Sequence, residues 1–241
     1  MTQTIAIARR ELTSLFCSPI AYVVLGLFGL GLALIFFGFS FAPGMPAELR
    51  DTYTWTVWLL IFLVPAISMR LVSEELRSGM IEPLMTAPLS DAQVIVGKWI
   101  GAMGFVLALL ILPTVVLMIV LESNASPDYG PMLTGLLGLI LVAGFYLSIG
   151  TFASAVTRNQ IIAFLLTIFI ISLFTLALYF LPRASFVSPD LSKALSYMNV
   201  NNQFEDFSKG LIDTGNFVYF FSGIALFLFF EIKALEVRRW W

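Results

Sequence analysis

The sequence has no histidine and a single cysteine, Cys17, among its 241 residues. One cysteine cannot form a disulfide within the chain, and zinc or haem sites usually need histidine or several cysteines. We therefore expect no disulfide framework and no metal site. Cys17 is most simply an apolar filler near a membrane surface.

Charge is also scarce. Only 12% of the residues are charged and 59% are hydrophobic, and the mean hydropathy is +0.95. The apolar residues come in runs of about 20, the length that crosses a bilayer core as a helix. A soluble helical protein would interrupt such runs with polar faces at helical spacing. The sequence thus predicts an all-α polytopic membrane protein with a single transmembrane domain over residues 1–241.

Six apolar runs predict six transmembrane helices. Pro65 and Pro113 fall inside two of them, which membrane helices tolerate because neighbouring groups satisfy the freed backbone. The last run has a short uninterrupted apolar part, 217–230. The predicted spans are about 20–41, 55–72, 99–121, 132–156, 161–181 and 216–235.

Lysine and arginine set the expected orientation, because cytoplasmic loops carry an excess of them. Nine fall on the side of the two termini and four on the other side. Both termini should therefore be cytoplasmic, in a multi-pass protein of a cell membrane, with a bacterial inner membrane expected. The nine are Arg9, Arg10, Arg70, Arg77, Lys98, Arg158, Lys233, Arg238 and Arg239.

Residues 1–19 precede the first span, and within them 2–16 predict an interfacial helix on the cytoplasmic leaflet. Apolar side chains share one face of this helix, and Arg9 and Arg10 lie elsewhere on it. The alternative is a signal peptide, with Arg9 and Arg10 as its basic region and cleavage near Phe41, but the following apolar run is too long for one. The apolar face consists of Ile5, Ala8, Leu12, Leu15 and Phe16.

The loop at 182–215 should be extracytoplasmic. It has two apolar faces at helical spacing, which predict two short amphipathic helices at the outer surface. An ordinary ordered loop with a few apolar anchors is the alternative. One face has Leu191, Leu195 and Met198, and the other has Phe204, Phe207, Leu211 and Ile212.

Catalytic and transport chemistry has little support within the spans. Arg70, Lys98, Glu231 and Lys233 fall at predicted cytoplasmic ends, where long side chains can reach the interface. Ion-coupled carriers usually place such groups at membrane depth. Hydrolase and metalloprotease motifs are absent, as is the phosphate-binding loop of ATPases: Gly97 and Lys98 are followed by Trp99. The chain should be no enzyme, and it shows no feature of a nucleic-acid-binding protein.

Small residues recur at a spacing of four, at Gly97 and Gly101 and at Gly144 and Ser148. This spacing lets helix backbones approach closely. We interpret it first as packing within the bundle. A dimer seam or a substrate path is the alternative.

Residues 73–98 form a charged connection between two apolar spans. A helix should continue from the second span through Glu74 and Glu75 and end at Gly79. Apolar residues then predict a second short helix that ends at Pro88, and Ser90 is a suitable N-cap for the third span. The segment is either a solvated loop or a lever that receives force from a soluble subunit. The apolar stripe consists of Met80, Ile81, Leu84 and Met85.

The run EELRSGMIEPLMTAPLS, followed by Gly97 and Lys98, resembles the cytoplasmic loop of ABC-2-type transporter permeases. The departures from that pattern are Met80, where threonine is usual, and Pro83. The run FEDFSKGLID at 204–213 more weakly resembles permeases of the gliding-motility and copper-enzyme-maturation branch, although a chain without histidine gives no support to a copper role.

The resemblance implies an ABC-2 permease fold similar to type V exporters, in a homodimer that works with two P-loop ATPase subunits. ATP and magnesium would be bound by the ATPase, and this chain would need no cofactor. Residues 73–91 would be the coupling loop, with an extracytoplasmic accessory protein as a further partner. The implied ATPase contacts are Glu74, Glu75, Arg77, Gly79, Met80, Ile81, Glu82, Leu84, Met85 and Pro88.

Three functions remain open at this stage. The leading one is the permease of an ATP-driven transporter, with export assumed from the resemblance. A second is a mechanical or scaffold subunit that uses the same ATPase to act on an extracytoplasmic partner through Phe204 and Phe207. An ion-coupled carrier, independent of ATP, is the third.

Overall fold

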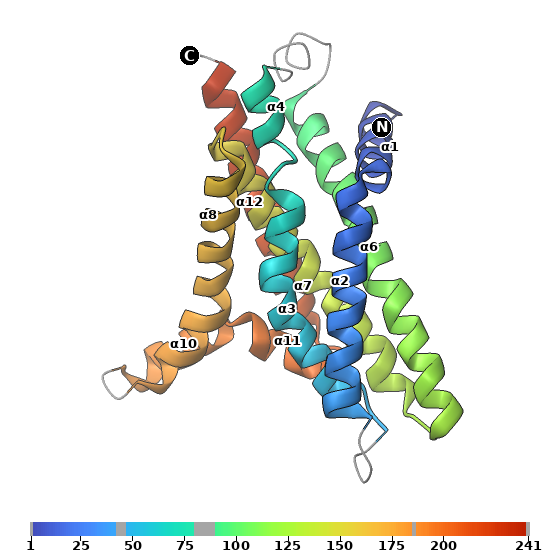
Figure 1. The fold of residues 1–241 in the computed structure, drawn as a ribbon. Helices are drawn as coiled ribbons and strands as arrows, with labels where there is room; N and C mark the ends of the chain where they lie inside the picture. Colours follow the sequence, from blue (N-terminus) through green and yellow to red (C-terminus); the bar gives the residue numbers. More distant parts are fainter. Residues whose placement is uncertain (1, 42–46, 80–89, 185–186, 240–241) are drawn as a thin grey trace.

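A computed structural model describes the chain except for residues 1, 42–46, 80–89, 185–186 and 240–241. The described residues are helical, with short turns between the helices, and both termini lie at the same end of a bundle (Figure 1). We call this the terminal end, and the other the opposite end. The main helices are α1 (Thr2–Cys17), α2 (Pro19–Ile35), α3 (Arg50–Ser68), α4 (Ser73–Ser78), α6 (Asp91–Asn124), α7 (Tyr129–Val156), α8 (Gln160–Ser172), α10 (Pro189–Tyr197), α11 (Val200–Ser208) and α12 (Thr214–Arg239).

Six helical segments are long and apolar enough to cross a membrane, which confirms the prediction of an all-helical protein with six spans. Two of them are extended by tighter or wider turns: α2 by the π-helical turn at Phe36–Ser40, and α8 by further turns that end at Arg183. The third span starts at Asp91 instead of residue 99, because the polar residues before 99 also form helical turns. The segments are Ala21–Ser40, Arg50–Ser78, Asp91–Asn124, Tyr129–Val156, Gln160–Arg183 and Thr214–Val237.

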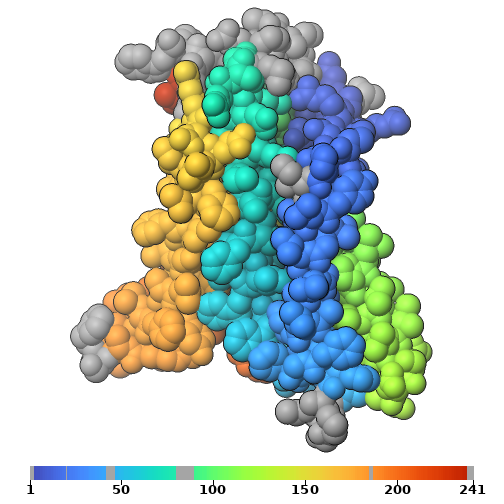
Figure 2. Space-filling model, in the orientation of Figure 1, coloured from blue at the N-terminus to red at the C-terminus, as the bar shows by residue number. Residues whose placement is uncertain are grey.

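Helix α7 is the centre of the bundle. It packs against α3, α6, α8, α11 and α12, and most of its length is buried. Glycines let its neighbours come close: a Cβ at Gly138 would lie 2.7 Å from Phe207 Cβ. On one face of the molecule, α3 lies between α8 and α2 (Figure 2). The bundle is therefore built around one central helix, with lipid-facing helices outside it.

Helix α1 packs across the first turns of α6. A Cβ at Gly97 would lie 2.9 Å from Thr4 O, and one at Gly101 would lie 2.6 Å from Ala8 O. These two glycines therefore do serve close packing, as their spacing predicted. The apolar face of α1 differs at one position from the prediction, because Ile5 is exposed and Ile7 is buried instead.

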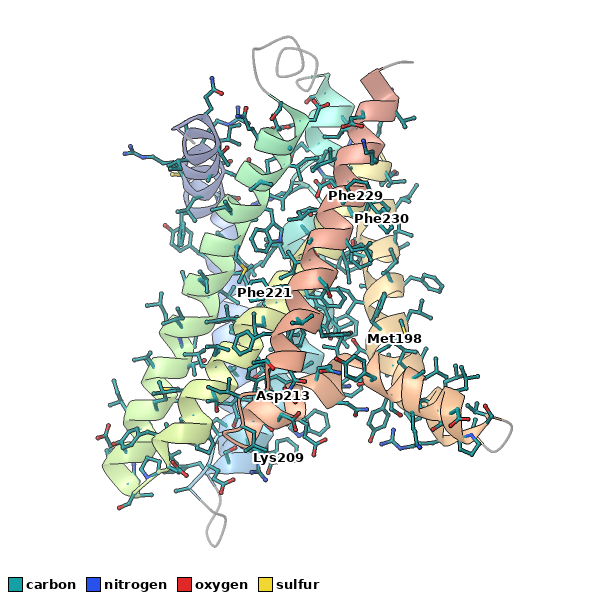
Figure 3. The ribbon with its side chains drawn as sticks, turned by 180° about the vertical axis from the view of Figure 1, so that it is seen from behind. Met198, Lys209, Asp213, Phe221, Phe229 and Phe230 are labelled. Carbon is teal, nitrogen blue, oxygen red and sulfur yellow. The ribbon has the colours of Figure 1, made fainter. Side chains whose placement is uncertain are left out.

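The opposite end carries the two short helices α10 and α11, so the segment before the last span is helical, as one of the two alternatives predicted. Phe204 and Phe207 are buried against α7. Leu211 and Ile212 do not share their face, because α11 ends at Ser208, and they are exposed. The turn that follows α11 holds Lys209 and Asp213 at the base of α12 (Figure 3).

Candidate functional site

The second span bends at the terminal end. Helix α3 ends at Ser68, the chain turns over residues 69–72, and α4 begins at Ser73, so the continuous helix expected there is wrong. The buried Ser154 hydroxyl of α7 holds this turn: it accepts hydrogen bonds from the N–H groups of Val72 (3.1 Å) and Ser73 (2.9 Å) and donates one to Met69 O (3.0 Å). A hydroxyl from another helix thus supplies the N-terminal cap that Val72 has no polar side chain to give.

The three charged side chains of helix α4 differ in their exposure to solvent. Glu74 and Arg77 are exposed, and Glu75 is buried. The helix ends at Gly79, whose φ of 72° is in the left-handed region that favours glycine. Gly79 therefore ends α4 as predicted.

The rest of the predicted ATPase contact, Met80, Ile81, Glu82, Leu84, Met85 and Pro88, lies outside the described residues. The structure resumes at Ser90, which caps α6. Its hydroxyl accepts from Gln93 N–H, and the Gln93 side chain accepts from Ser90 N–H, a reciprocal capping box. The predicted N-cap is therefore correct.

Lys98, in the second turn of α6, is the centre of the site. Its side chain is only 3% exposed, and its ammonium donates to Glu75 Oε1 (2.8 Å), Leu71 O (2.8 Å) and Glu11 Oε2 (3.3 Å). These three acceptors use all three donors of the ammonium group. One cation thus joins α6 to α4, to the turn before α4 and to α1.

Arg10 adds the fourth charge. Its guanidinium donates to Glu75 Oε1 at 3.0 Å, and its side chain as a whole is 57% exposed. Arg10, Glu11, Glu75 and Lys98, which we call the junction cluster, carry two positive and two negative charges. The predicted residues Glu75 and Arg10 thus meet, whereas Arg9, Glu74 and Arg77 are exposed and make no ion pair among the described residues.

Glu231 of α12 is fully buried, with 0% of its surface exposed. The expectation that both Lys98 and Glu231 reach the membrane interface is therefore wrong. Lys98 can be buried because oxygen atoms of Glu75, Leu71 and Glu11 replace water around its ammonium group. Lys233 is exposed, as expected, and pairs with Glu236 one turn further on.

Glu11 and Ser154 were not singled out from the sequence, and Lys98 and Glu231 were noted only as charges at the ends of spans, Lys98 also in the motif that carries the family resemblance. One feature of the sequence pointed to Lys98: it lies between Gly97 and Gly101, whose spacing predicts a closely packed neighbouring helix. That helix is α1, and it brings Glu11 to Lys98. Nothing in the sequence pairs Ser154 with residues 69–73, since this contact depends on how α3 and α7 cross.

The site consists of ion pairs and hydrogen bonds that join neighbouring helices. Among the described residues, no three His, Cys, Asp or Glu side chains come together to hold a metal ion. Buried charge pairs instead fix geometry, because removing one partner leaves a costly uncompensated charge. The junction cluster therefore links α1, α4 and the start of α6 through one buried cation.

The model of one protein family matches the chain. This is the family of ABC-2 type transporters, and the match covers residues 2–202, from α1 into α11. A search of curated proteins found no match. The chain belongs to the ABC-2 type transporter family as a multi-pass membrane subunit, which has no ATPase activity of its own and pairs with an ATPase subunit.

Proposed function

We propose that this chain is the permease of an ATP-driven exporter, and that its residues 73–91 receive the movement of the ATPase. The observation that carries the proposal is the three-way contact of Lys98 with Glu75, Leu71 O and Glu11. Any displacement of α4 acts directly on α6 and α1 through this buried cation. The positive-inside rule supports a cytoplasmic terminal end, where an ATPase would dock, in a bacterial inner membrane.

The exposed and buried sides of α4 suit two tasks. Glu74 and Arg77 are exposed and accessible to a partner, whereas Glu75 and Leu76 are buried in the bundle. By resemblance to the family, Glu82 and the apolar stripe from Met80 to Met85 would sit in the groove of the ATPase. Helix α4 would then be the rigid link between that groove and the junction cluster.

The transporter would contain two copies of this chain and two ATPase subunits. Helix α1 would lie on the cytoplasmic leaflet, with the exposed Arg9 close to lipid headgroups. ATP binding would close the ATPases together and displace both coupling loops. Motion results only if the ATPase holds the loop differently in its two nucleotide states.

The first experiment is purification of the tagged protein from native membranes in mild detergent, with identification of copurified proteins. We expect a stoichiometric P-loop ATPase. Glu82→Lys and Glu74→Lys should each weaken its retention, because both reverse a charge on the proposed contact. Glu48→Lys makes the same change at the exposed opposite end and should retain the ATPase. If no ATPase copurifies even after crosslinking in intact membranes, the proposal is wrong.

A second candidate is an ATPase-driven subunit that acts on an extracytoplasmic partner without moving a substrate. Helix α10 favours it, because none of its residues is buried and it extends away from the bundle (Figure 1). The resemblance of 204–213 to the gliding-motility and copper-enzyme-maturation branch agrees with such a role. Replacing the exposed Leu191 and Tyr197 of α10 by serine should then abolish function while ATPase binding and activity persist. A pure exporter should tolerate both changes.

A further inference from the structure

A pocket lies at the terminal end of the bundle, beside the turn that joins α3 to α4. Its volume is about 170 Å³, and residues of α1, α2, α3, α4, α6 and α8 line it. Three of these helices, α8, α3 and α2, lie next to one another on the face shown in Figure 2. A cavity of about 150 Å³ can hold a molecule the size of benzene, so this one has room for a small organic group. We call it the Arg70 pocket.

The Arg70 pocket has an apolar floor and a charged mouth. Three of the residues that line it, Leu15, Ile67 and Phe105, are buried. Arg70 in the turn is half-buried, and Glu74 of α4 is exposed. Because exposure rises from the apolar residues to the charged ones, a ligand that fills the pocket has to be amphiphilic, with its polar end at the solvent side.

The two charged side chains leave most of their hydrogen-bonding capacity unused. Arg70 makes one hydrogen bond within the described residues, from its guanidinium to Ser18 Oγ at 3.4 Å. A guanidinium has five N–H donors. Neither Arg70 nor Glu74 belongs to an ion pair in the part of the chain that the structure describes, so the two do not pair with each other. Both charges are therefore open to a ligand.

One cation and one carboxylate in the same pocket favour a zwitterionic ligand. A guanidinium donates two parallel hydrogen bonds to a phosphate, and a carboxylate accepts from a primary ammonium. A phosphate diester that carries a primary ammonium at one end and an apolar body at the other is phosphatidylethanolamine. Phosphatidylglycerol offers no ammonium to Glu74, and the quaternary ammonium of phosphatidylcholine has no N–H to donate.

The pocket also lies at the level of a headgroup. Ser18, which accepts from Arg70, is the corner between the predicted interfacial helix α1 and the membrane-spanning helix α2. Val24 of α2 lines the pocket, and its neighbours Val23 and Leu27 are exposed apolar side chains. The acyl chains of a lipid held by its headgroup would therefore lie along α2 in the bilayer.

We propose that the Arg70 pocket binds phosphatidylethanolamine from the cytoplasmic leaflet, with the phosphate on Arg70, the ammonium on Glu74 and the glycerol backbone on the apolar floor. Gln160 of α8 also lines the pocket, and its amide can donate to the phosphate or accept from the ammonium. The bound lipid bridges the corner between α1 and α2 and the turn between α3 and α4. The inference goes beyond the proposed function, since the site needs no ATPase.

The test is native mass spectrometry of the full-length protein, delipidated in detergent and titrated separately with phosphatidylethanolamine, phosphatidylglycerol and phosphatidylcholine of equal acyl chains. We expect the wild type to bind phosphatidylethanolamine about tenfold or more tightly than the other two, as for one charged hydrogen bond. Arg70→Met should lower its affinity by a similar factor. Glu74→Gln should remove the preference for phosphatidylethanolamine and leave binding of the other two lipids unchanged.

Matched controls come from an exposed ion pair on α12 at the same end of the bundle. Lys233→Met and Glu236→Gln remove the same charges there and should leave lipid binding unchanged. Val24→Phe fills the pocket and should lower the affinity for phosphatidylethanolamine, whereas Val23→Phe, at a 60% exposed position, should not. Size-exclusion profiles identify variants that do not fold. If Arg70→Met is one of them, Arg70→Lys replaces it, because a lysine keeps the charge and loses the planar pair of donors.

Unchanged affinity in Arg70→Met or in Val24→Phe overturns the inference, as does a wild type that does not discriminate among the three lipids. Glycerophosphoethanolamine, the same headgroup without acyl chains, should not displace the lipid at equal concentration, and displacement would show that the ligand is a soluble compound instead. The preparation contains no ATPase, so these outcomes are separate from failure of the proposed function. Absence of a copurified ATPase would overturn that function and leave the lipid site untouched.

Discussion

The Lys98 ammonium and the Glu75 carboxylate lie 2.8 Å apart, in a buried contact between residues 23 positions apart in the chain. The contact joins the start of one predicted membrane helix to the short helix at the end of another. Since Glu11 of α1 meets the same ammonium, three segments that the sequence shows as separate behave as one junction.

Lys98→Met should destabilise the protein by up to about 3–5 kcal/mol, because it removes the buried cation of Glu11 and leaves Glu75 paired only with the largely exposed Arg10. The free energy of unfolding in mixed micelles, titrated with a denaturing detergent, measures this. Lys233→Met is the matched control: its exposed pair with Glu236 should be worth about 0.5 kcal/mol or less. Equal effects of the two changes would show that the junction cluster contributes no special stability.

Ser154→Ala should loosen the turn between α3 and α4. It removes three hydrogen bonds and leaves the buried N–H groups of Val72 and Ser73 without an acceptor, at a cost of about 1–3 kcal/mol for each unsatisfied group. We expect faster hydrogen exchange at the amides of residues 71–76. Ser123→Ala, an exposed serine bonded only within its own helix turn and to its neighbour Asn124, should leave that exchange unchanged. Protection that survives Ser154→Ala would contradict the capping role.

Gly101→Val should push α1 away from α6, since a Cβ there would meet the Ala8 carbonyl oxygen at 2.6 Å. A displaced α1 breaks the contact of Glu11 with Lys98 and exposes the backbone at Arg9 and Arg10. Trypsin should therefore cleave at these arginines several times faster than in the wild type. Gly29→Val adds a side chain where no atom lies within 4 Å of the new Cβ, so trypsin should cleave this variant at the wild-type rate. Slow cleavage of Gly101→Val would mean that α1 is held elsewhere.

Hydropathy was sufficient to predict six helical spans from the sequence, because a helix that must bury its backbone in lipid leaves a long apolar run; the family came from the resemblance of residues 74–90. Local chemistry was also predictable: Ser90 caps α6, and Gly79 ends α4 at a positive φ. Contacts between helices were not: the burial of Lys98 depends on how α1 and α4 pack against α6, and that of Glu231 on how α12 packs against α7, and no local pattern encodes either. The prediction that Lys98 and Glu231 reach the membrane interface was wrong for this reason.

The two aromatic anchors at the opposite end should matter more than their apolar neighbour. Phe207→Ala removes a fully buried ring that packs against the rings of Phe217 and Phe220, and it should cost about 3–5 kcal/mol. Leu211 was assigned to the same face from the sequence, but it is 58% exposed, and Leu211→Ser should change stability by about 0.5 kcal/mol or less. Detergent-titrated unfolding of the two variants checks both values.

Gly79→Val should separate ATP hydrolysis from movement of the bundle. The φ of 72° at this position is costly for a β-branched residue, so the end of α4 must change its course. A Cβ at Gly79 would meet no atom within 4 Å, so the change should not disturb packing or insertion in the membrane. We expect the purified complex to keep its ATPase activity while the nucleotide-dependent change in α4 position is lost. Because position 79 lies between Glu75 and the docking residues proposed for 80–88, a variant that still moves α4 with nucleotide would show that force enters the bundle by another route.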